Sequence, residues 1–143
     1  MSFLIQELSE PIRVKEKKKN REVLSNMEAR AIKRYIPTSP RKMRLLVDLI
    51  RHLNVEDGLN TLKFSKKHPA KVIEKTLLSA YSNLVSKLDT GRLDKKEVII
   101  KEAFVDGGPV LKRMLPAPQG RAYRIRKRSA HLTLVVENIE EKN

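Results

Sequence analysis

Hydrophobic residues recur at helical spacing in three segments of the middle of the chain. The first segment starts at Ser39-Pro40, where a serine suits the position that caps free amides and a proline suits the first helical position. Apolar residues then follow three or four positions apart: Met43, Leu46, Val47, Ile50 and Leu53. The pattern predicts an amphipathic helix with basic residues on its other faces.

Two further helices follow from the same pattern. One is expected to begin after Asn54, with Gly58 as a weak point. The longest is expected from about Pro69 to Leu88, with a stop at residues 89–91. Its apolar face consists of Ile73, Leu77, Ala80 and Leu84. Together the three segments predict helices that cover one face of a small sheet.

Strand-like patterns stand on both sides of this helical region. Residues 27–37 are apolar enough for a strand, and Pro37 would stop a helix. Residues 97–105 are rich in β-branched and aromatic residues, and residues 122–136 end in an alternating pattern. A Pro-Ala-Pro-Gln-Gly turn signal lies between these two segments. They predict one long hairpin at about 98–136, whose arms could each reach roughly 60 Å.

The two ends of the predicted hairpin differ in chemistry. Residues 106–109, Asp-Gly-Gly-Pro, are expected to form a bend or bulge that separates them. The base is expected to pack in the core through Val98, Ile100, Phe104, Leu132, Leu134 and Val136. The sequence therefore predicts an α+β fold with a projecting arm. We expect residues 1–26 to be an extension that orders only on a partner, residues 27–138 to be a single domain, and residues 139–143 to be a polar tail.

The positive charge is concentrated in two stretches. The chain has 143 residues and a formal charge of +14, which indicates a polyanionic partner. Residues 29–47 and 107–130 lack Asp and Glu, and they contribute six and seven basic residues respectively. The other 100 residues hold 18 of the 31 basic residues and all 17 acidic ones, so they are almost neutral. A basic surface kept for solubility would not predict such segregation.

These two stretches indicate binding to nucleic acid, mainly through phosphates and shape. Arg124, Arg126 and Arg128 share one face of a strand, and three charges in a row make burial of that face in a dry core costly. Tyr123 could stack on a base or cover the apolar side of the arm. The predicted nucleic-acid contacts are Arg30, Lys33, Arg34, Arg41, Lys42, Arg44, Lys112, Arg113, Arg121, Arg124, Arg126, Lys127 and Arg128.

Other classes of function find little support. The chain has no Cys, and His52, His68 and His131 fall on different predicted elements, so we expect no metal site, no cofactor and no enzymatic activity. The N-terminus does not resemble a signal peptide and no stretch approaches a membrane span, so we expect a cytoplasmic protein without a membrane partner. The alternative is an architectural DNA-binding protein whose basic β-arm inserts Pro116 or Pro118 between bases.

Several motifs, in order, resemble the large-subunit ribosomal protein twenty-two family of bacterial type. They are EARAIKRY at 28–35, SPRKMRLLVDLIR at 39–51, FVDGGP at 104–109, LKR at 111–113, GRA at 120–122 and RIRKR at 124–128. The resemblance covers about residues 27–138. It implies three helices packed on a small three-stranded antiparallel sheet, with a long projecting β-hairpin.

The resemblance also implies a function that composition does not give. It implies a structural constituent of the large ribosomal subunit that binds large-subunit rRNA, supports subunit assembly and lines the nascent-polypeptide exit tunnel with its hairpin tip. The implied partners are rRNA, neighbouring large-subunit proteins and the nascent chain, with one copy per ribosome and no homo-oligomer. The residues that match the tip region are Leu111, Met114, Pro116, Ala117, Pro118, Gln119 and Gly120. Ala117 and Gln119 stand where basic residues are frequent in that family, so the tip carries less charge.

Overall fold

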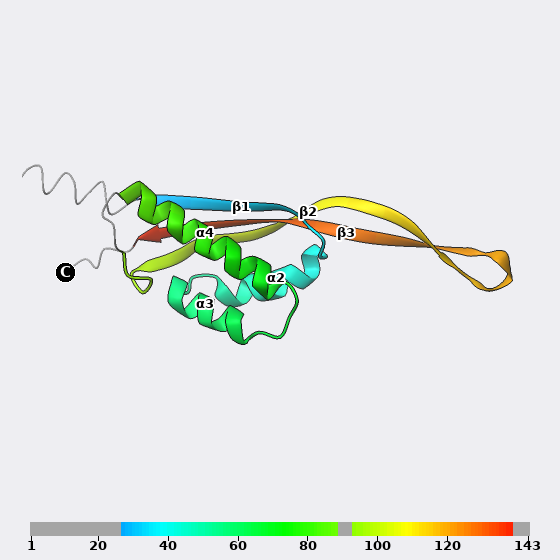
Figure 1. Cartoon of the computed structure of the whole chain (residues 1–143), viewed down its shortest axis with the longest axis horizontal. Helices are drawn as coiled ribbons and strands as arrows, with labels where there is room; N and C mark the ends of the chain where they lie inside the picture. Colours follow the sequence, from blue (N-terminus) through cyan, green and yellow to red (C-terminus); the bar gives the residue numbers. More distant parts are fainter. Residues whose placement is uncertain (1–26, 89–92, 139–143) are drawn as a thin grey trace, which may run out of the picture.

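The described part of the chain forms three α-helices and three strands, and two of the strands continue past the rest of the fold as an arm (Figure 1). The structure is a computed structural model that describes residues 27–88 and 93–138. Its helices and strands are β1 (Glu28–Ile36), α2 (Pro40–Ile50), α3 (Val55–Phe64), α4 (Ala70–Leu88), β2 (Val98–Pro116) and β3 (Ala122–Asn138). The expected extension at 1–26, helix stop at 89–91 and tail at 139–143 lie outside the described residues.

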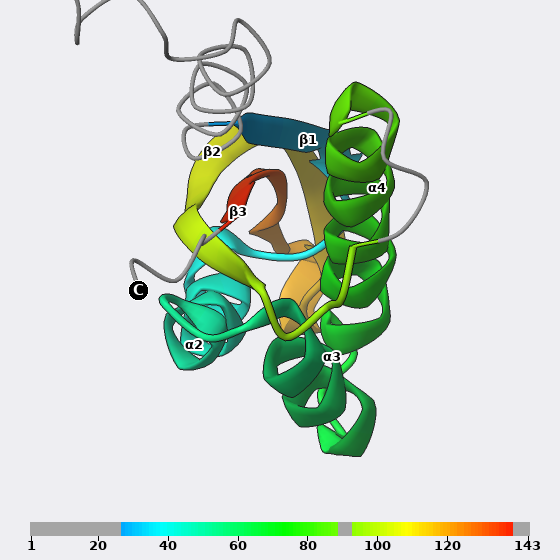
Figure 2. The same cartoon turned by 90° about the vertical axis from the view of Figure 1, so that its left-hand side faces the viewer.

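The sheet is antiparallel, with strand order β1-β3-β2. The helices cover one of its faces: α4 lies along β1, α2 lies along β2, and α3 packs against both helices (Figure 2). Leu77 and Leu84 of α4 and Leu132 and Leu134 of β3 are completely buried between the two layers. The α+β architecture predicted from the hydrophobic pattern is confirmed. None of the described helices is long and apolar enough to cross a membrane.

The start of α2 confirms one predicted role and corrects another. Ser39 occupies the N-cap position and Pro40 is the first helical residue, as the sequence predicts. The Ser39 side chain, however, makes no capping hydrogen bond. Its backbone carbonyl instead accepts hydrogen bonds from the amides of Lys42 and Met43, at 3.1 and 3.3 Å. The prediction that the serine side chain caps the first amides was therefore wrong.

The end of α2 comes earlier than its apolar stripe indicates. Met43, Leu46, Val47 and Ile50 are buried, but the helix stops at Ile50. The His52 amide donates to the carbonyl of Ile100, and the Ile100 amide donates to the carbonyl of Leu53. Leu53 therefore belongs to a short segment that pairs with β2, because this segment satisfies its backbone groups on the sheet edge rather than in another helical turn.

A bulge in β2 changes which side chains face the core. The pairing with β3 shifts between Ile100 and Glu102, so the alternation of faces reverses there. Ala103 and Val105 are buried as a result, whereas Phe104 is 39% exposed on the opposite face. The other five predicted base residues are completely buried. The prediction that Phe104 packs in the core was wrong, because simple alternation does not account for the inserted residue.

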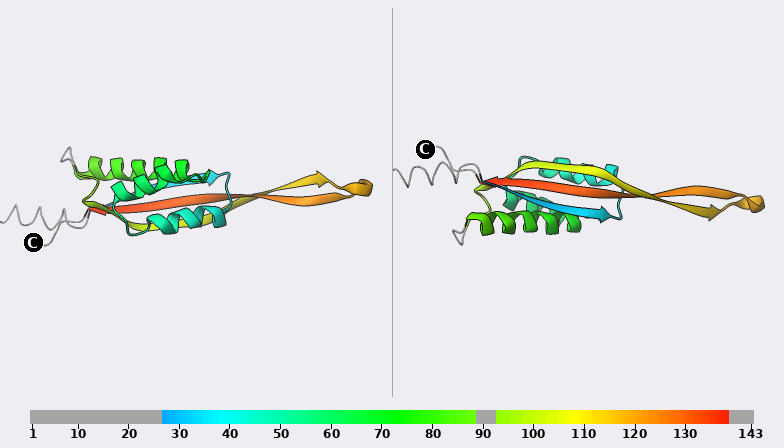
Figure 3. Two further views of the ribbon diagram at one scale, coloured as in Figure 1. Left: turned by 90° about the horizontal axis from the view of Figure 1, so that it is seen from below. Right: turned by 90° about the horizontal axis from the view of Figure 1, so that it is seen from above.

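The arm consists of residues 107–130 and begins at a second bulge. The pairing of β2 with β3 shifts between Gly107 and Val110, which confirms the bend predicted at residues 106–109. Paired positions then run from Val110↔Arg128 to Pro116↔Ala122. The two strands coil around each other beyond the end of β1 (Figure 3). A short turn at Pro118–Gly120 closes the arm, and Gln119 and Gly120 have φ values of 61° and 70° there.

Candidate nucleic-acid interface

The basic side chains singled out in the sequence lie on the surface of the fold. All thirteen are exposed, and within residues 27–88 and 93–138 none of them forms a salt bridge. Seven of them lie on the arm and six on β1 and α2. Exposed cations without carboxylate partners favour an anionic partner outside the chain.

The arm brings like charges close together across its two strands. Lys112 is paired with Arg126, and Arg124, Arg126 and Arg128 alternate along β3. Directly opposed like charges weaken a two-stranded ribbon unless an anion lies between or beside them. None of the described helices covers the ribbon between Val110 and Ala122 (Figure 1). The arm is therefore suited to being surrounded by phosphates.

The cations of α2 do not all have the same role. Nε and Nη2 of Arg44 donate hydrogen bonds to the carbonyl oxygen of Val105, at 3.3 and 3.0 Å. Arg51, which follows α2 directly, makes a similar bond from Nη2 to the carbonyl of Ala103, at 2.9 Å. Arg41 and Lys42 have no such bond among the described residues. Arg44 thus holds α2 against β2, whereas Arg41 and Lys42 can bind an external anion.

The two acid-free stretches meet where the arm leaves the sheet. A groove of about 1040 Å³ lies there, which we call the shoulder groove. Its walls come from the end of β1, the start of α2, the connection between α3 and α4, and both strands of the arm root. The cations that line it are Lys42, Lys67, Arg126, Lys127 and Arg128, and no lining residue is acidic.

Tyr35 is fixed on one wall of the shoulder groove. It stands at a register shift of β1 with a φ of 55°, and its side chain is 68% exposed. Its backbone N–H donates to Nδ1 of His131 at 3.0 Å. The two rings meet edge to face, with centroids 5.0 Å apart and planes at 89°. The contacts with His131 therefore hold the backbone and the ring in one position.

Sequence reasoning missed several residues of this groove. Lys67 and His68 lie between two predicted helices, and only the charge of the Lys66-Lys67 pair could have drawn attention to them. Tyr35 falls within residues 27–37, for which the sequence predicts only a strand. Its exposure depends on the β1 bulge, for which the sequence carries no clear signal.

The structure separates the residues that match the family's tip region. Pro118, Gln119 and Gly120 form the turn, and Met114 near it is 74% exposed. Leu111, in contrast, pairs with Lys127 next to the bulge and lines the shoulder groove. It therefore lies at the root of the arm, away from the other six residues.

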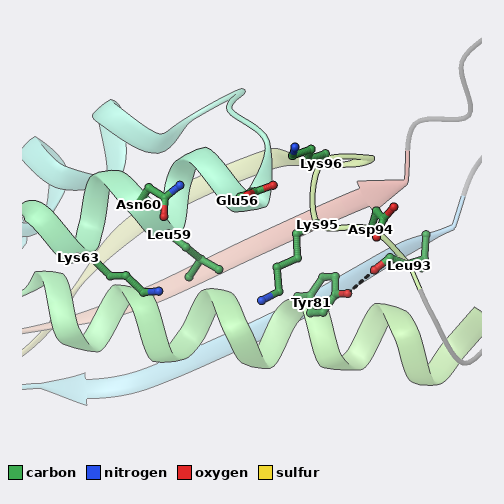
Figure 4. A pocket seen from close by; sticks show the side chains of 9 residues that line it. All are labelled: Glu56, Leu59, Asn60, Lys63, Tyr81, Leu93, Asp94, Lys95 and Lys96. Atoms are coloured by element: carbon green, nitrogen blue, oxygen red, sulfur yellow. Dashed lines mark hydrogen bonds between the residues drawn. The ribbon is translucent and has the colours of Figure 1, made fainter.

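A second hollow, of about 470 Å³, lies between α3, α4 and the segment before β2 (Figure 4). The hydroxyl of Tyr81 donates to the carbonyl of Leu93 at 2.5 Å, and Nζ of Lys95 lies 5.8 Å from the Tyr81 ring centroid. Three lysines line it, but so do Glu56 and Asp94. This mixed charge suits a phosphate less well than the shoulder groove does.

Two acidic side chains of the sheet are engaged within the fold. The ammonium group of Lys101 donates to carboxylates of Glu28 and Glu137, the latter at 2.7 Å. The hydrogen bonds to Glu137 and Glu28 raise the pKa of Lys101 above its ordinary value. Among the described residues, no three His, Asp or Glu side chains are grouped as a metal site would require.

Comparison with known proteins gives consistent matches. The family model described as ribosomal protein L22p/L17e matches residues 31–137. The chain is 56% identical over 100 residues to large ribosomal subunit protein uL22 of Christiangramia forsetii, covering 70% of this chain and 74% of that protein. It is 50% identical over 116 residues to the uL22 of Chlorobaculum tepidum, covering 81% and 98%. The uL22 of Bacteroides thetaiotaomicron is 51% identical over 111 residues, covering 76% and 81%.

Proposed function

Because this chain belongs to the ribosomal protein L22p/L17e family, we propose that it is a structural constituent of the large ribosomal subunit that binds large-subunit rRNA. The observation that carries the proposal is the distribution of charge on the fold. Thirteen exposed cations without intramolecular salt bridges in the described residues lie on the arm, β1 and α2. As a member of a ribosomal protein family, the chain is a structural component rather than an enzyme.

The arm and α2 would bind the same RNA partner in different ways. The arm is two strands thick, so it can enter a gap between RNA helices and be contacted on both sides. Each phosphate that an Arg or Lys neutralises releases counterions, and this release favours binding. Because α2 is tied to β2 next to the arm, phosphates bound by Arg41 and Lys42 would fix the direction in which the arm points. By binding separate RNA segments with the arm and with α2, the protein would support subunit assembly.

The tip is proposed to line the nascent-polypeptide exit tunnel. The turn and the residues beside it carry no charge from Met114 to Gly120, while Arg113 and Arg121 flank them. A cationic shaft with a neutral end suits a segment that passes through RNA and emerges in a passage. Met114 and Leu115 would offer exposed apolar surface to a nascent chain.

The remaining proposals concern the surroundings of the protein. We propose neighbouring large-subunit proteins and the nascent chain as further partners, with one copy per cytoplasmic ribosome. We also propose that residues 27–138 form one domain that includes the arm.

Sedimentation tests the central proposal. A tagged copy of the full chain, expressed in a bacterium, should sediment with large ribosomal subunits in a lysate at low salt. Absence from that fraction would contradict the proposal. Competition binding at physiological salt separates the alternative, since a preference for duplex DNA over large-subunit rRNA would indicate an architectural DNA-binding protein.

A further inference from the structure

The shoulder groove differs from the arm in that it offers apolar surface as well as charge. Tyr35, Leu45 and Leu111 line it and are 68%, 56% and 53% exposed. Its volume of about 1040 Å³ is just above the ~300–1,000 Å³ typical of pockets that enclose a small organic group. A phosphate backbone alone would leave these apolar walls in contact with water.

The backbone at Tyr35 indicates that the position of this ring is imposed by its surroundings. A φ of 55° is uncommon for a bulky residue, and such conformations persist only where neighbouring contacts determine them. Here the neighbour is His131, which accepts the Tyr35 N–H and meets the ring edge to face. Tyr35 remains 68% exposed despite these contacts, so a ring that is already held in position keeps surface free for a further partner.

The cations around the groove identify the class of group that could cover Tyr35. Lys42 of α2 and Lys127 of the arm root line the same groove, without any acidic residue. A flat aromatic group attached to phosphates matches both features, and a nucleotide contains such a group. In a paired RNA helix the faces of the bases are covered by their neighbours, so only an unpaired nucleotide presents a free face.

We propose that the shoulder groove binds an unpaired nucleotide of the RNA, with its base stacked on Tyr35 and its flanking phosphates beside Lys42 and Lys127. The proposal rests on the proposed function, because it specifies which RNA element that interface takes. The protein would then bind RNA in two ways. The arm and α2 recognise charge and shape, and the shoulder groove recognises an unpaired base.

The test compares two RNA stem-loops of equal length, one with a fully paired stem and one with a short run of unpaired adenines in the stem. Tyr35→Asn removes the ring and keeps a residue that tolerates a positive φ. We expect it to weaken binding of the bulged RNA by about 5- to 150-fold, the loss that corresponds to one stacked base. Binding of the paired RNA and the salt dependence of both affinities should not change, because no charge is removed.

Tyr35→Phe should bind the bulged RNA like the wild type, because it retains the ring. Phe64→Asn is the matched control, since Phe64 is 87% exposed on α3 and does not line the groove; it should have no effect. An unchanged affinity of Tyr35→Asn for the bulged RNA, or an equal loss on both RNAs, would overturn the inference. Failure of the wild type to bind either stem-loop or large-subunit rRNA at low salt would overturn the proposed function as well.

Ultraviolet crosslinking of the wild-type chain to the bulged RNA gives a readout that does not depend on a variant. The peptide that contains Tyr35 should carry a nucleotide adduct. Crosslinks on arm peptides without one at Tyr35 would show RNA binding and contradict the stacking.

Discussion

Arg44 donates two hydrogen bonds to the carbonyl oxygen of Val105, one from Nε at 3.3 Å and one from Nη2 at 3.0 Å. These bonds join the face of α2 to β2 just before the arm begins. The sequence groups Arg44 with Arg41 and Lys42 as a candidate for phosphate binding. The structure distinguishes it, because its guanidinium already satisfies a backbone carbonyl of the sheet.

Substitution of Arg44 should therefore affect stability as well as RNA binding. We expect Arg44→Gln to lower the free energy of unfolding by about 1–2 kcal/mol, because it removes charge-assisted hydrogen bonds to Val105. Arg41→Gln, on the same helix, should leave stability unchanged and weaken rRNA binding. Urea denaturation of both variants checks the first expectation. Equal stability of the two variants would show that the contact with Val105 contributes nothing measurable.

The three arginines on one face of the arm should contribute to binding but not to folding. In Arg124→Gln/Arg126→Gln/Arg128→Gln, the slope of log affinity for rRNA against log salt should become shallower by about 2 to 3. The melting temperature should stay almost the same, because all three arginines are exposed. The matched control replaces Lys63, Lys95 and Lys96, which line the mixed-charge hollow, by Gln. A large loss of stability in the arm variant would mean that the arm belongs to the core.

Gly58 allows α3 to approach the sheet closely. A Cβ at this position would lie 3.1 Å from Cδ1 of Ile100, a completely buried side chain. Gly→Ala in a helix usually stabilises by roughly 0.5–1 kcal/mol, but we expect Gly58→Ala to gain nothing, because Ile100 must move. Ile100→Val removes Cδ1 and should cost about 0.5–1.5 kcal/mol alone. In that background Gly58→Ala should become stabilising, and denaturation of the four proteins measures the coupling. If Gly58→Ala changed the free energy of unfolding equally in the wild type and in Ile100→Val, a clash with Cδ1 of Ile100 would be excluded.

Lys101 gives the sheet a dependence on pH in alkaline solution. Hydrogen bonds to Glu137 and Glu28 raise its pKa above the ordinary 10.5. A group whose pKa is raised by folding stabilises fully below its unfolded pKa, and this contribution is lost as the pH rises through the folded value. We expect Lys101→Met to melt below the wild type by a constant amount between about pH 6 and pH 10, and the difference to shrink above that range. Lys75→Met on α4 is the control. A difference that vanished between about pH 6 and pH 9 would contradict the assignment.

The tip should be dispensable for folding, but its removal should change the properties of the proposed exit tunnel. Replacing residues 115–123 by Asn-Gly joins Met114 to Arg124, which already face each other, through a turn suited to a hairpin. We expect an unchanged melting temperature, because all but one of the residues removed are exposed and the other, Ala117, is outside the core. Ribosomes that contain the shortened protein should respond differently to an antibiotic that binds in the exit tunnel. An unchanged response, with the variant incorporated, would contradict the tunnel proposal.

The helices and the hairpin could be predicted because local patterns determine them. Met43, Leu46, Val47 and Ile50 form one apolar stripe whichever partner covers it, and the Pro-rich turn can only reverse the chain. Phe104 could not be placed in this way. Its direction depends on a bulge between Ile100 and Glu102, and an inserted residue reverses every later side chain without changing the composition of the strand.

The candidate interface was predictable only in part, for a related reason. Absence of carboxylates along residues 29–47 and 107–130 is a property of the chain itself, and it is enough to identify cationic surfaces. That Arg44 is tied to Val105, and that Leu111 lies at the root of the arm, depends on the packing of α2 beside β2 and on the register of β2 with β3.

The sequence by itself determined the elements, the α+β class, the arm and the sign of its charge, because these follow from residue types and their spacing along the chain. Only the tertiary structure decided that Tyr35, Lys42, Lys67 and Lys127 surround one groove. These residues come from β1, α2, the connection before α4, and β3, and their proximity depends on sheet order and strand register. Contacts between residues so far apart in the chain arise from the packing of whole elements, which no local pattern specifies.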